Sequence, residues 1–321
     1  MKIFLCRLAL AIVCSAWSFA PAQSYPARPV KIVVPFAAGG VADITARVLS
    51  QKMSGSLGQQ VLVDNRPSAG GIVAAEAVAK AEPDGYTLLF MTNGNAVSES
   101  LFKSLPYSSV KDFAPVSTVG FFDLVIVVND DSKIRSLREL IDAAKSNPGK
   151  LNVGTINIGG TQNLGAELFK SMAGIDVQIV PFKATPAVIL ALKGGDVQVA
   201  FEFIAPVAAQ IKSGGLRPLA VTSGARFAGL ADVPTAEEAG LPGYQVSSWN
   251  AVAAPAKTPA AVIERLNKEV NVAIASPEVK QRLLDLGVNA RAGTPEQLRD
   301  LLAAEIAKWR AVIERAKIEK Q

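Results

Sequence analysis

The 321-residue sequence contains no histidine, and its only two cysteines, Cys6 and Cys14, lie near the N-terminus. Without imidazole the chain cannot build a histidine zinc site or a nucleophilic triad that uses a histidine base. Once the N-terminal segment described below is removed, no thiol remains for a disulfide or a cysteine metal site. We therefore expect neither a metal nor a cofactor.

The first 22 residues have the pattern of a secretory signal peptide. Lys2 and Arg7 precede an apolar core from Leu8 to Val13, and Ala20-Pro21-Ala22 supplies small residues at the end. This pattern predicts cleavage after Ala22 and export of the mature chain. No later run approaches the roughly 20 apolar residues that a membrane span needs.

The charge of the mature chain is only mildly positive. Of 33 basic residues, Lys2 and Arg7 leave with the leader, so 31 remain against 28 acidic residues. The basic residues are scattered among acids and form no run with interleaved aromatic residues, which argues against nucleic-acid binding. A modest positive balance suits an anionic ligand.

Apolar strand-like runs alternate with helix-like segments, beginning with Val30, Ile32, Val33 and Val34. The alternation predicts an α/β protein with parallel sheets flanked by helices. The further strands are predicted at Val61 to Val63, Tyr86 to Met91, Leu124 to Val128, Leu151 to Thr155, Val177 to Phe182, Val197 to Phe201 and Leu216 to Thr222. Hydroxyl residues before helices predict N-caps at Ser136, Thr185, Thr258, Ser276 and Thr294.

The pattern changes after Gly243, where a strand from Gln245 to Ala253 is followed by three helices. The last helix carries an apolar stripe that must pack back onto the first sheet: Leu298, Leu301, Leu302, Ile306, Trp309, Val312 and Ile313. We therefore predict two lobes, residues 23–119 with 248–321 and residues 120–247. Two crossings between them make a hinge beside a cleft that suits a small ligand.

Four glycine-bearing or polar loops lie between a strand and a helix, where open α/β sheets bind ligands: Phe36 to Asp43, Arg66 to Gly71, Asn157 to Asn163 and Phe182 to Pro186. Unpaired N–H groups at helix starts attract anions, and glycine lets a ligand approach the backbone. Each loop alone is more typical of an ordinary turn, but four together favour an anion site. None has the spacing of a nucleotide-binding motif.

The sequence allows two interpretations, one functional and one structural, for several side chains near these loops. Asp43 suits the first turn of a helix better than the role of a general base. Glu202 is either a hydrogen-bond acceptor at a strand end or, slightly more often, a surface acid, and Lys183 is either a cation at the pocket mouth or solvated. Phe36, Phe182 and Trp249 either line the cleft or pack in the core.

Segments throughout the mature chain resemble the extracytoplasmic solute-binding receptors of the tripartite tricarboxylate transporter family, also called Bug receptors. They include YPARPVKIVVPFAAGG with Asp43, VLVDNRPSAGG, LPYSSVKDFAPV, VPFKATPAV and ADVPTAEEAGLPGY. The resemblance implies a type II periplasmic binding protein fold, in which two βα lobes close on a ligand. It also implies a monomeric periplasmic protein with no enzymatic activity.

The resemblance implies as ligand a small organic anion: a di- or tricarboxylate, an amino acid or an aromatic carboxylate. The partner would be an integral membrane permease. The alternative hypothesis is a sensor subunit that docks on a membrane signalling protein. A third and weaker hypothesis is an enzyme that uses Asp43 or Glu202 as a general base. The predicted ligand-binding residues are Phe36, Ala38, Gly39, Gly40, Asp43, Ser68, Ala69, Gly70, Thr92, Asn93, Thr155, Gly159, Gly160, Thr161, Asn163, Phe182, Lys183, Ala184 and Glu202. Asn163, Phe182, Ala184 and Glu202 depart from residues common in the family, so specificity is expected to differ.

Overall fold

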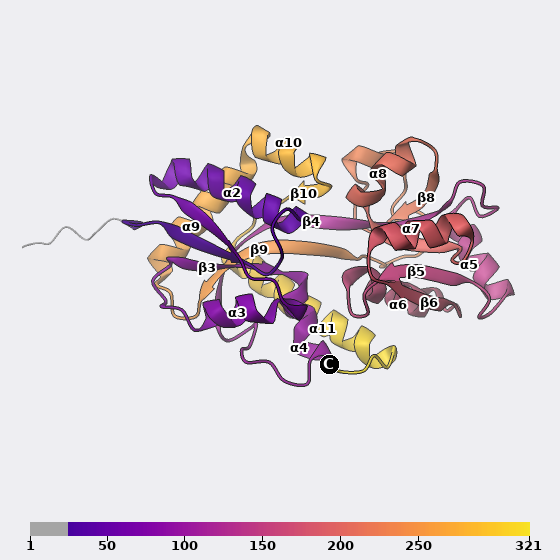
Figure 1. Ribbon diagram of the computed structural model, residues 1–321, viewed down its shortest axis with the longest axis horizontal. Helices are drawn as coiled ribbons and strands as arrows, with labels where there is room; N and C mark the ends of the chain where they lie inside the picture. Colours follow the sequence, from indigo (N-terminus) through magenta and orange to yellow (C-terminus); the bar gives the residue numbers. More distant parts are fainter. Residues whose placement is uncertain (1–24) are drawn as a thin grey trace, which may run out of the picture.

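The computed structural model describes residues 25–321, which fold into two α/β lobes joined by a pair of long strands (Figure 1). The signal peptide predicted at residues 1–22 lies outside the described residues. None of the helices in residues 25–321 combines the length and the apolar character that a membrane span requires.

Lobe 1 is built on a sheet in the order β2-β1-β3-β9-β4, with β10 on the other side of β4. Its strands are β1 (Val30–Val34), β2 (Val61–Asn65), β3 (Thr87–Thr92), β9 (Ser247–Pro255), β10 (Val288–Ala290) and the first part of β4 (Phe113–Asn129). Its helices are α2 (Val41–Leu57), α3 (Ile72–Ala79) after a 3₁₀ turn (Ala69–Gly71), α4 (Asn93–Leu101), α9 (Ala260–Ala275), α10 (Pro277–Asp285) and α11 (Pro295–Arg315).

Lobe 2 uses the second part of β4, in the order β4-β7-β5-β6 with β8 on the far side of β4. Its strands are β5 (Asn152–Ile156), β6 (Gln178–Phe182), β7 (Val199–Phe203) and β8 (Leu216–Val221). Its helices are α5 (Leu137–Ser146), α6 (Thr161–Ala173), α7 (Thr185–Gly194), α8 (Ile204–Lys212) and a 3₁₀ turn (Ala228–Leu230).

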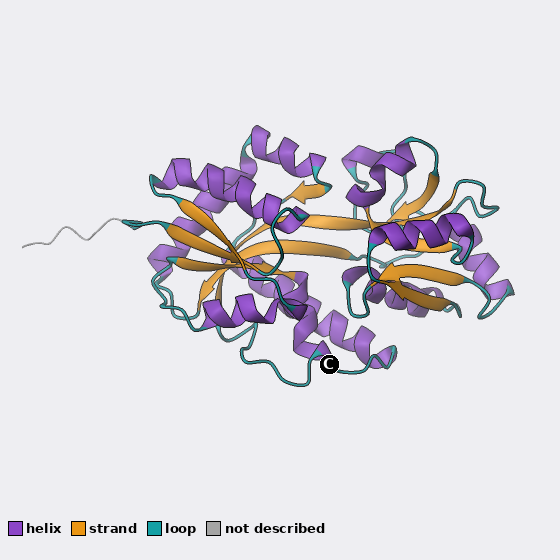
Figure 2. Ribbon diagram, viewed as in Figure 1, coloured by secondary structure: helices purple, strands orange, loops and turns teal. Residues whose placement is uncertain are grey.

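Strands β4 and β9 connect the lobes and appear as two long strands through the middle of the molecule (Figure 2). They pair antiparallel until Asp123 lies opposite Ser247, and from Leu124 onward β4 pairs with β7 and β8 instead. Trp249 lies on this connection, opposite Phe121, and is buried. The two chain crossings between the lobes therefore run side by side, as a hinge requires.

The apolar stripe of α11 packs in the core as predicted, with Leu298 and Trp309 fully buried. The helix contacts α4 and β4 in lobe 1 and also reaches α6 of lobe 2. The predicted parallel pairing holds within each lobe, but β9 pairs antiparallel with β3 and β4, and β4 pairs antiparallel with β7 and β8, so the sheets are mixed. The three-residue strand β10 was too short to give a pattern in the sequence.

Three of the five predicted N-caps are confirmed: the hydroxyls of Ser136, Ser276 and Thr294 each accept an N–H group of the following first turn. The predictions for Thr185 and Thr258 are wrong. Thr185 is the first helical residue of α7, and its hydroxyl donates to the Glu202 carboxylate at 2.9 Å. The Thr258 hydroxyl donates to the Pro255 carbonyl at 2.8 Å, and Pro259 stands at the N-cap of α9.

Candidate functional site

In lobe 1, the loop between β1 and α2 is held by the Asp43 carboxylate, which is almost fully buried. The Gly39 N–H donates to Oδ2 at 2.8 Å, and Arg47 Nε donates to the same oxygen at 3.0 Å. Asn65 Nδ2 donates to Oδ1 at 2.9 Å and also to the Phe36 carbonyl at 3.0 Å. Asp43 therefore fixes the shape of the loop, as expected of a carboxylate in a first helical turn.

Burial raises the pKa of Asp43, but hydrogen bonds from Arg47, Gly39 and Asn65, together with the Arg47 charge, outweigh burial and place this pKa below its usual value. Asp43 is thus ionised at neutral pH and fully occupied by the loop and its neighbours. Asp43 could accept a proton only if these contacts were broken. The arrangement therefore indicates that Asp43 stabilises the loop and does not act as a general base.

In lobe 2, the loop between β5 and α6 repeats the arrangement. The Gly159 N–H donates to the Asn163 Oδ1 atom at 3.1 Å, across the same four-residue spacing that separates Gly39 from Asp43. Gly39 has φ +86° and Gly159 has φ +79°, values that favour glycine. The second glycine of each pair, Gly40 or Gly160, is the N-cap of the following helix in extended backbone.

The helices that begin at these loops lack side-chain caps. No side chain caps the first turn of α2, α6, α7 or α8, whereas α5, α10 and α11 each have a serine or threonine cap. Helix α9 also lacks such a cap, but it follows the hinge strand β9 and a proline. First-turn N–H groups without an intrahelical partner attract anions through their own hydrogen bonds and through the helix dipole.

The loops of the two lobes lie at facing edges of their sheets. Strands β1, β2 and β3 run parallel, as do β5, β6 and β7, so each set brings its carboxyl ends to one edge. Figure 1 shows the starts of α2 and α7 on the sides of the lobes that face each other. We call the loops at these carboxyl ends, residues 35–40, 66–71, 157–160 and 183–184, the inter-lobe loops.

One hydrogen bond and a packing contact join the lobes at this edge. Asn93 Nδ2 donates to Thr161 Oγ1 at 3.1 Å, and Trp309 Nε1 donates to Asn93 Oδ1 at 2.9 Å. A Cβ atom placed on Gly159 would lie 2.6 Å from Leu101 Cδ2 of lobe 1, so this loop packs directly on α4. Asn93 thus links the C-terminal helix of lobe 1 to the first turn of α6.

The predicted site residues fall into three groups by exposure: buried, exposed and half-buried. The buried residues are Asp43, Thr92, Asn93, Thr155, Gly159, Asn163 and Glu202. Those that are exposed and accessible to a ligand are Phe36, Ala38, Gly39, Gly40, Ala69, Lys183 and Ala184, while Ser68, Gly70, Gly160, Thr161 and Phe182 are half-buried. Trp249 belongs to the core of the hinge and does not line the edge.

The interpretation of Glu202 as a surface acid is wrong. The residue lies inside β7, opposite Val125, and its side chain has no exposed surface. Thr185 Oγ1 donates to Oε2 at 2.9 Å, and Gln162 Nε2 approaches the same oxygen at 3.5 Å. Burial raises the pKa of Glu202 to about 7, although the hydrogen bonds from Thr185 and Gln162 oppose the rise.

The predicted ligand-binding residues did not include Asn65, Ile158, Gln162 or Thr185, although the last three lie in loops singled out above. Asn65 ends β2 and Ile158 is exposed at the tip of the lobe 2 loop, while Gln162 and Thr185 contact Glu202. Ile158 and Gln162 lie within a loop already singled out, so their positions were available in the sequence. The contacts of Asn65 and Thr185 depend on strand neighbours that sequence spacing does not give.

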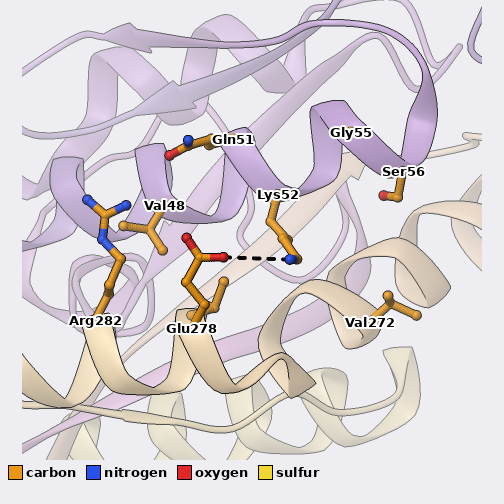
Figure 3. A pocket seen from close by; sticks show the side chains of 9 residues that line it. Val48, Gln51, Lys52, Gly55, Ser56, Val272, Glu278 and Arg282 are labelled. Carbon is orange, nitrogen blue, oxygen red and sulfur yellow. Dashed lines mark ion pairs between the residues drawn. The ribbon is translucent and has the colours of Figure 1, made fainter.

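A separate surface pocket of about 310 Å³ lies on the outer side of lobe 1 between α2, α9 and α10 (Figure 3). Lys52 Nζ and Glu278 Oε2 form an ion pair across it at 3.7 Å, with Arg282 on the same side as Glu278. It contains none of the predicted site residues. In residues 25–321, no group of three or more potential ligand side chains is placed to hold a metal ion.

Comparisons with known proteins agree with the two-lobed architecture. The family described as tripartite tricarboxylate transporter family receptor matches residues 45–318. Protein BugT of Bordetella pertussis is 39% identical over 294 residues, which cover 91% of this chain and 90% of BugT.

Two solved structures are similar over nearly the whole chain. A Rhodopseudomonas palustris protein solved with adipate has 33% identity and a TM-score of 0.77, covering 92% of this chain and 99% of that one. MatC from the same organism, with bound malate, has 32% identity and a TM-score of 0.73, covering 90% and 100%. The chain therefore belongs to the tripartite tricarboxylate transporter receptor family and is a solute-binding protein of the TctC and Bug type.

Proposed function

We propose that this receptor captures a small organic anion with at least one carboxylate between its lobes and delivers it to a tripartite tricarboxylate-type membrane permease. The protein would act as a monomer in the periplasm after cleavage behind Ala22. The observation that carries the proposal is the matched pair of loops, in which Asp43 and Asn163 each hold a glycine turn at the start of an uncapped helix.

The number of available donors is sufficient for useful affinity. Hydrogen bonds to a charged group contribute about 1.5 to 3 kcal/mol each, so four or five can support micromolar binding without an arginine clamp. A ligand that contacts a helix start in each lobe binds the closed arrangement better than an open one. Its binding would therefore shift the population toward closure.

The exposed side chains of the loops favour a ligand with a hydrocarbon segment. Phe36 is 46% exposed and Ile158 is 56% exposed, on the loops that precede α2 and α6. Apolar surface at a binding site gains free energy when a ligand covers it. Between the ligands seen in the two similar structures, adipate offers a chain of methylene groups and malate a hydroxyl group, so we infer a preference for adipate-like acids.

The direct test is calorimetric titration of the purified mature protein with adipate, malate, citrate, glutamate and benzoate. We expect one ligand per chain and micromolar affinity for at least one acid. Gly160→Val should abolish this binding, because its Cβ would lie 3.1 Å from the Asn157 carbonyl and distort the loop. Gly55→Val, on α2 where a Cβ meets open space, is the matched control and should keep the affinity.

Delivery to a permease is tested separately by uptake of the radiolabelled acid in a strain that lacks the receptor. Transport by the parent strain and its loss in the deletion strain support the proposal. Unchanged uptake with lost induction of transport genes would instead assign the receptor to a sensing role.

A further inference from the structure

Glu202 is the one buried acid that lies at the start of several helices of lobe 2. It contacts Thr185, the first residue of α7, and Gln162, the second residue of α6, and it directly precedes Phe203, the N-cap of α8. Its second carboxyl oxygen, Oε1, is buried and has no hydrogen-bond partner among residues 25–321. A buried carboxylate oxygen without a hydrogen bond lowers the stability of the folded protein. Protonation of the carboxyl group or a new hydrogen-bond partner would remove this cost.

Among residues 25–321, no lysine or arginine forms an ion pair with this carboxyl group. Its partners from α6 and α7 are the neutral Gln162 and Thr185, and its register partner on β4 is Val125. The acidic side chains on the adjoining segments are Glu167, half-buried on α6, and Asp123, buried on β4. The basic ones are Lys183 before α7, Lys170 on α6, Lys193 on α7 and Lys212 on α8. Asp123 accepts a hydrogen bond from Ser247 Oγ at 2.7 Å, and burial raises its pKa, so it needs its own control.

We propose that Glu202 takes up a proton from solvent when the receptor binds its anion, so that capture of the ligand is coupled to protonation. This inference rests on the proposed function, because it places the ligand's carboxylate at the start of α6. An ionised Glu202 would repel that carboxylate and would compete with it for the positive end of the helix. Protonation adds one O–H bond to Glu202 and removes both effects.

The direction of the pH dependence follows from the free protein. Burial raises the pKa of Glu202 to about 7 before any ligand is present. A bound anion favours the neutral acid and raises this pKa further, so affinity is highest below pH 7. Affinity then falls as pH rises through 7 and levels off above the pKa of the complex. If binding raises the pKa of Glu202 by one further unit, the affinity at low pH is tenfold higher than the affinity at high pH.

The experiment is titration calorimetry with adipate and malate as probes at pH 7.5, in HEPES and in Tris at equal ionic strength. Because the two buffers differ in ionisation enthalpy, the difference in observed heat gives the number of protons taken up. With pKa values of about 7 and 8 in the free and bound protein, wild type should take up about half a proton. The carboxyl groups of both probes are ionised at this pH and contribute none.

Three variants test whether Glu202 is the group that takes up the proton. Glu202→Gln keeps the size of the side chain and should bind with no proton uptake and with an affinity that is flat from pH 6 to 8.5. Asp123→Asn is the matched control and should keep the uptake of wild type. Thr185→Val removes a hydrogen bond to the ionised form, so the fall in affinity should move to higher pH.

The outcomes separate the two proposals. Binding of a probe without proton uptake, or with uptake that persists in Glu202→Gln or disappears in Asp123→Asn, overturns the inference and leaves the proposed function standing. If no carboxylate binds at any pH, both proposals fail. The wild-type measurement and Thr185→Val keep the inference testable should Glu202→Gln fail to fold.

Discussion

Asp43 and Asn163 perform the same structural task in the two lobes: each accepts the N–H of the glycine four residues before it, at 2.8 Å and 3.1 Å. The residues four positions further along differ in charge. Arg47 pairs with Asp43, whereas Glu167 stands at the corresponding position after Asn163. The carboxylate in the first lobe therefore has a cation four residues away, and the second lobe has a neutral amide where the residue at that spacing is acidic.

This difference predicts the effect of exchanging the two side chains. Asn163→Asp should keep the contact with Gly159 but add an uncompensated charge in the first turn of α6, where we propose that the ligand's carboxylate binds. At an effective dielectric of about 20, two unit negative charges about 8 Å apart repel each other by about 2 kcal/mol. A ligand carboxylate at such a separation from an aspartate at position 163 should therefore bind at least tenfold more weakly, which we expect for adipate. Calorimetry checks this, and an unchanged affinity would separate Asn163 from the ligand site.

The reciprocal change, Asp43→Asn, should mainly affect stability. It removes the ion pair with Arg47 and should cost about 1 kcal/mol of unfolding free energy at pH 7. The pKa of Asp43 is lowered by folding, so the stability from its ionised form is present above its unfolded pKa and lost as pH falls through the folded pKa. The two proteins should therefore converge in urea unfolding at strongly acidic pH, and a constant difference would refute this account.

The glycine pair offers a test of backbone geometry. Gly39 has φ +86°, so Gly39→Ala should cost about 1 to 2 kcal/mol and weaken ligand binding, although its Cβ would meet open space. Gly40 has φ −79°, and a Cβ there would be 3.8 Å from the Ala37 carbonyl. Gly40→Ala should thus be nearly neutral in thermal unfolding. Equal effects of the two changes would show that backbone strain at Gly39 plays no part.

Selectivity tests the apolar character of the loops. Ile158→Ser removes exposed apolar surface from the inter-lobe loops and should reduce adipate affinity about three- to fivefold while leaving malate affinity nearly unchanged. Val272→Ser, on the outer pocket between α2 and α9, is a similarly exposed control and should alter neither affinity. A preference for malate in wild type, or equal losses for both acids in Ile158→Ser, would contradict the inferred hydrocarbon segment.

Burial of Glu202 predicts a stabilising substitution. Folding raises the pKa of Glu202 from 4.5 to about 7, so ionisation in the folded protein opposes folding. This cost is absent below pH 4.5, grows as pH rises and is complete above pH 7, where it amounts to about 3 kcal/mol. Glu202→Gln should therefore unfold at a higher urea concentration than wild type at pH 8 and at the same concentration at pH 4. Lower stability at pH 8 would mean that the carboxylate has a compensating partner.

Local signals were enough to place most of the strands, three of the five predicted helix caps and the glycine loops. The spacing of Gly39 to Asp43 and of Gly159 to Asn163 is visible in the sequence, because both contacts are made within one turn. The surroundings of Glu202 were not visible: the predicted strand ended at Phe201, and the observed strand continues to Phe203, which places Glu202 inside the sheet. The contact of Asn93 with Thr161 joins residues 68 positions apart and depends on how the lobes pack.

The most direct test of the central claim is a crystal structure of the mature protein grown with adipate. We predict one adipate molecule between the lobes, with a carboxylate accepting hydrogen bonds from N–H groups in the first turns of α2 and α6. Adipate bound elsewhere, for example in the outer pocket beside Lys52 and Arg282, with the inter-lobe loops unchanged and unoccupied, would contradict the proposed mode of binding.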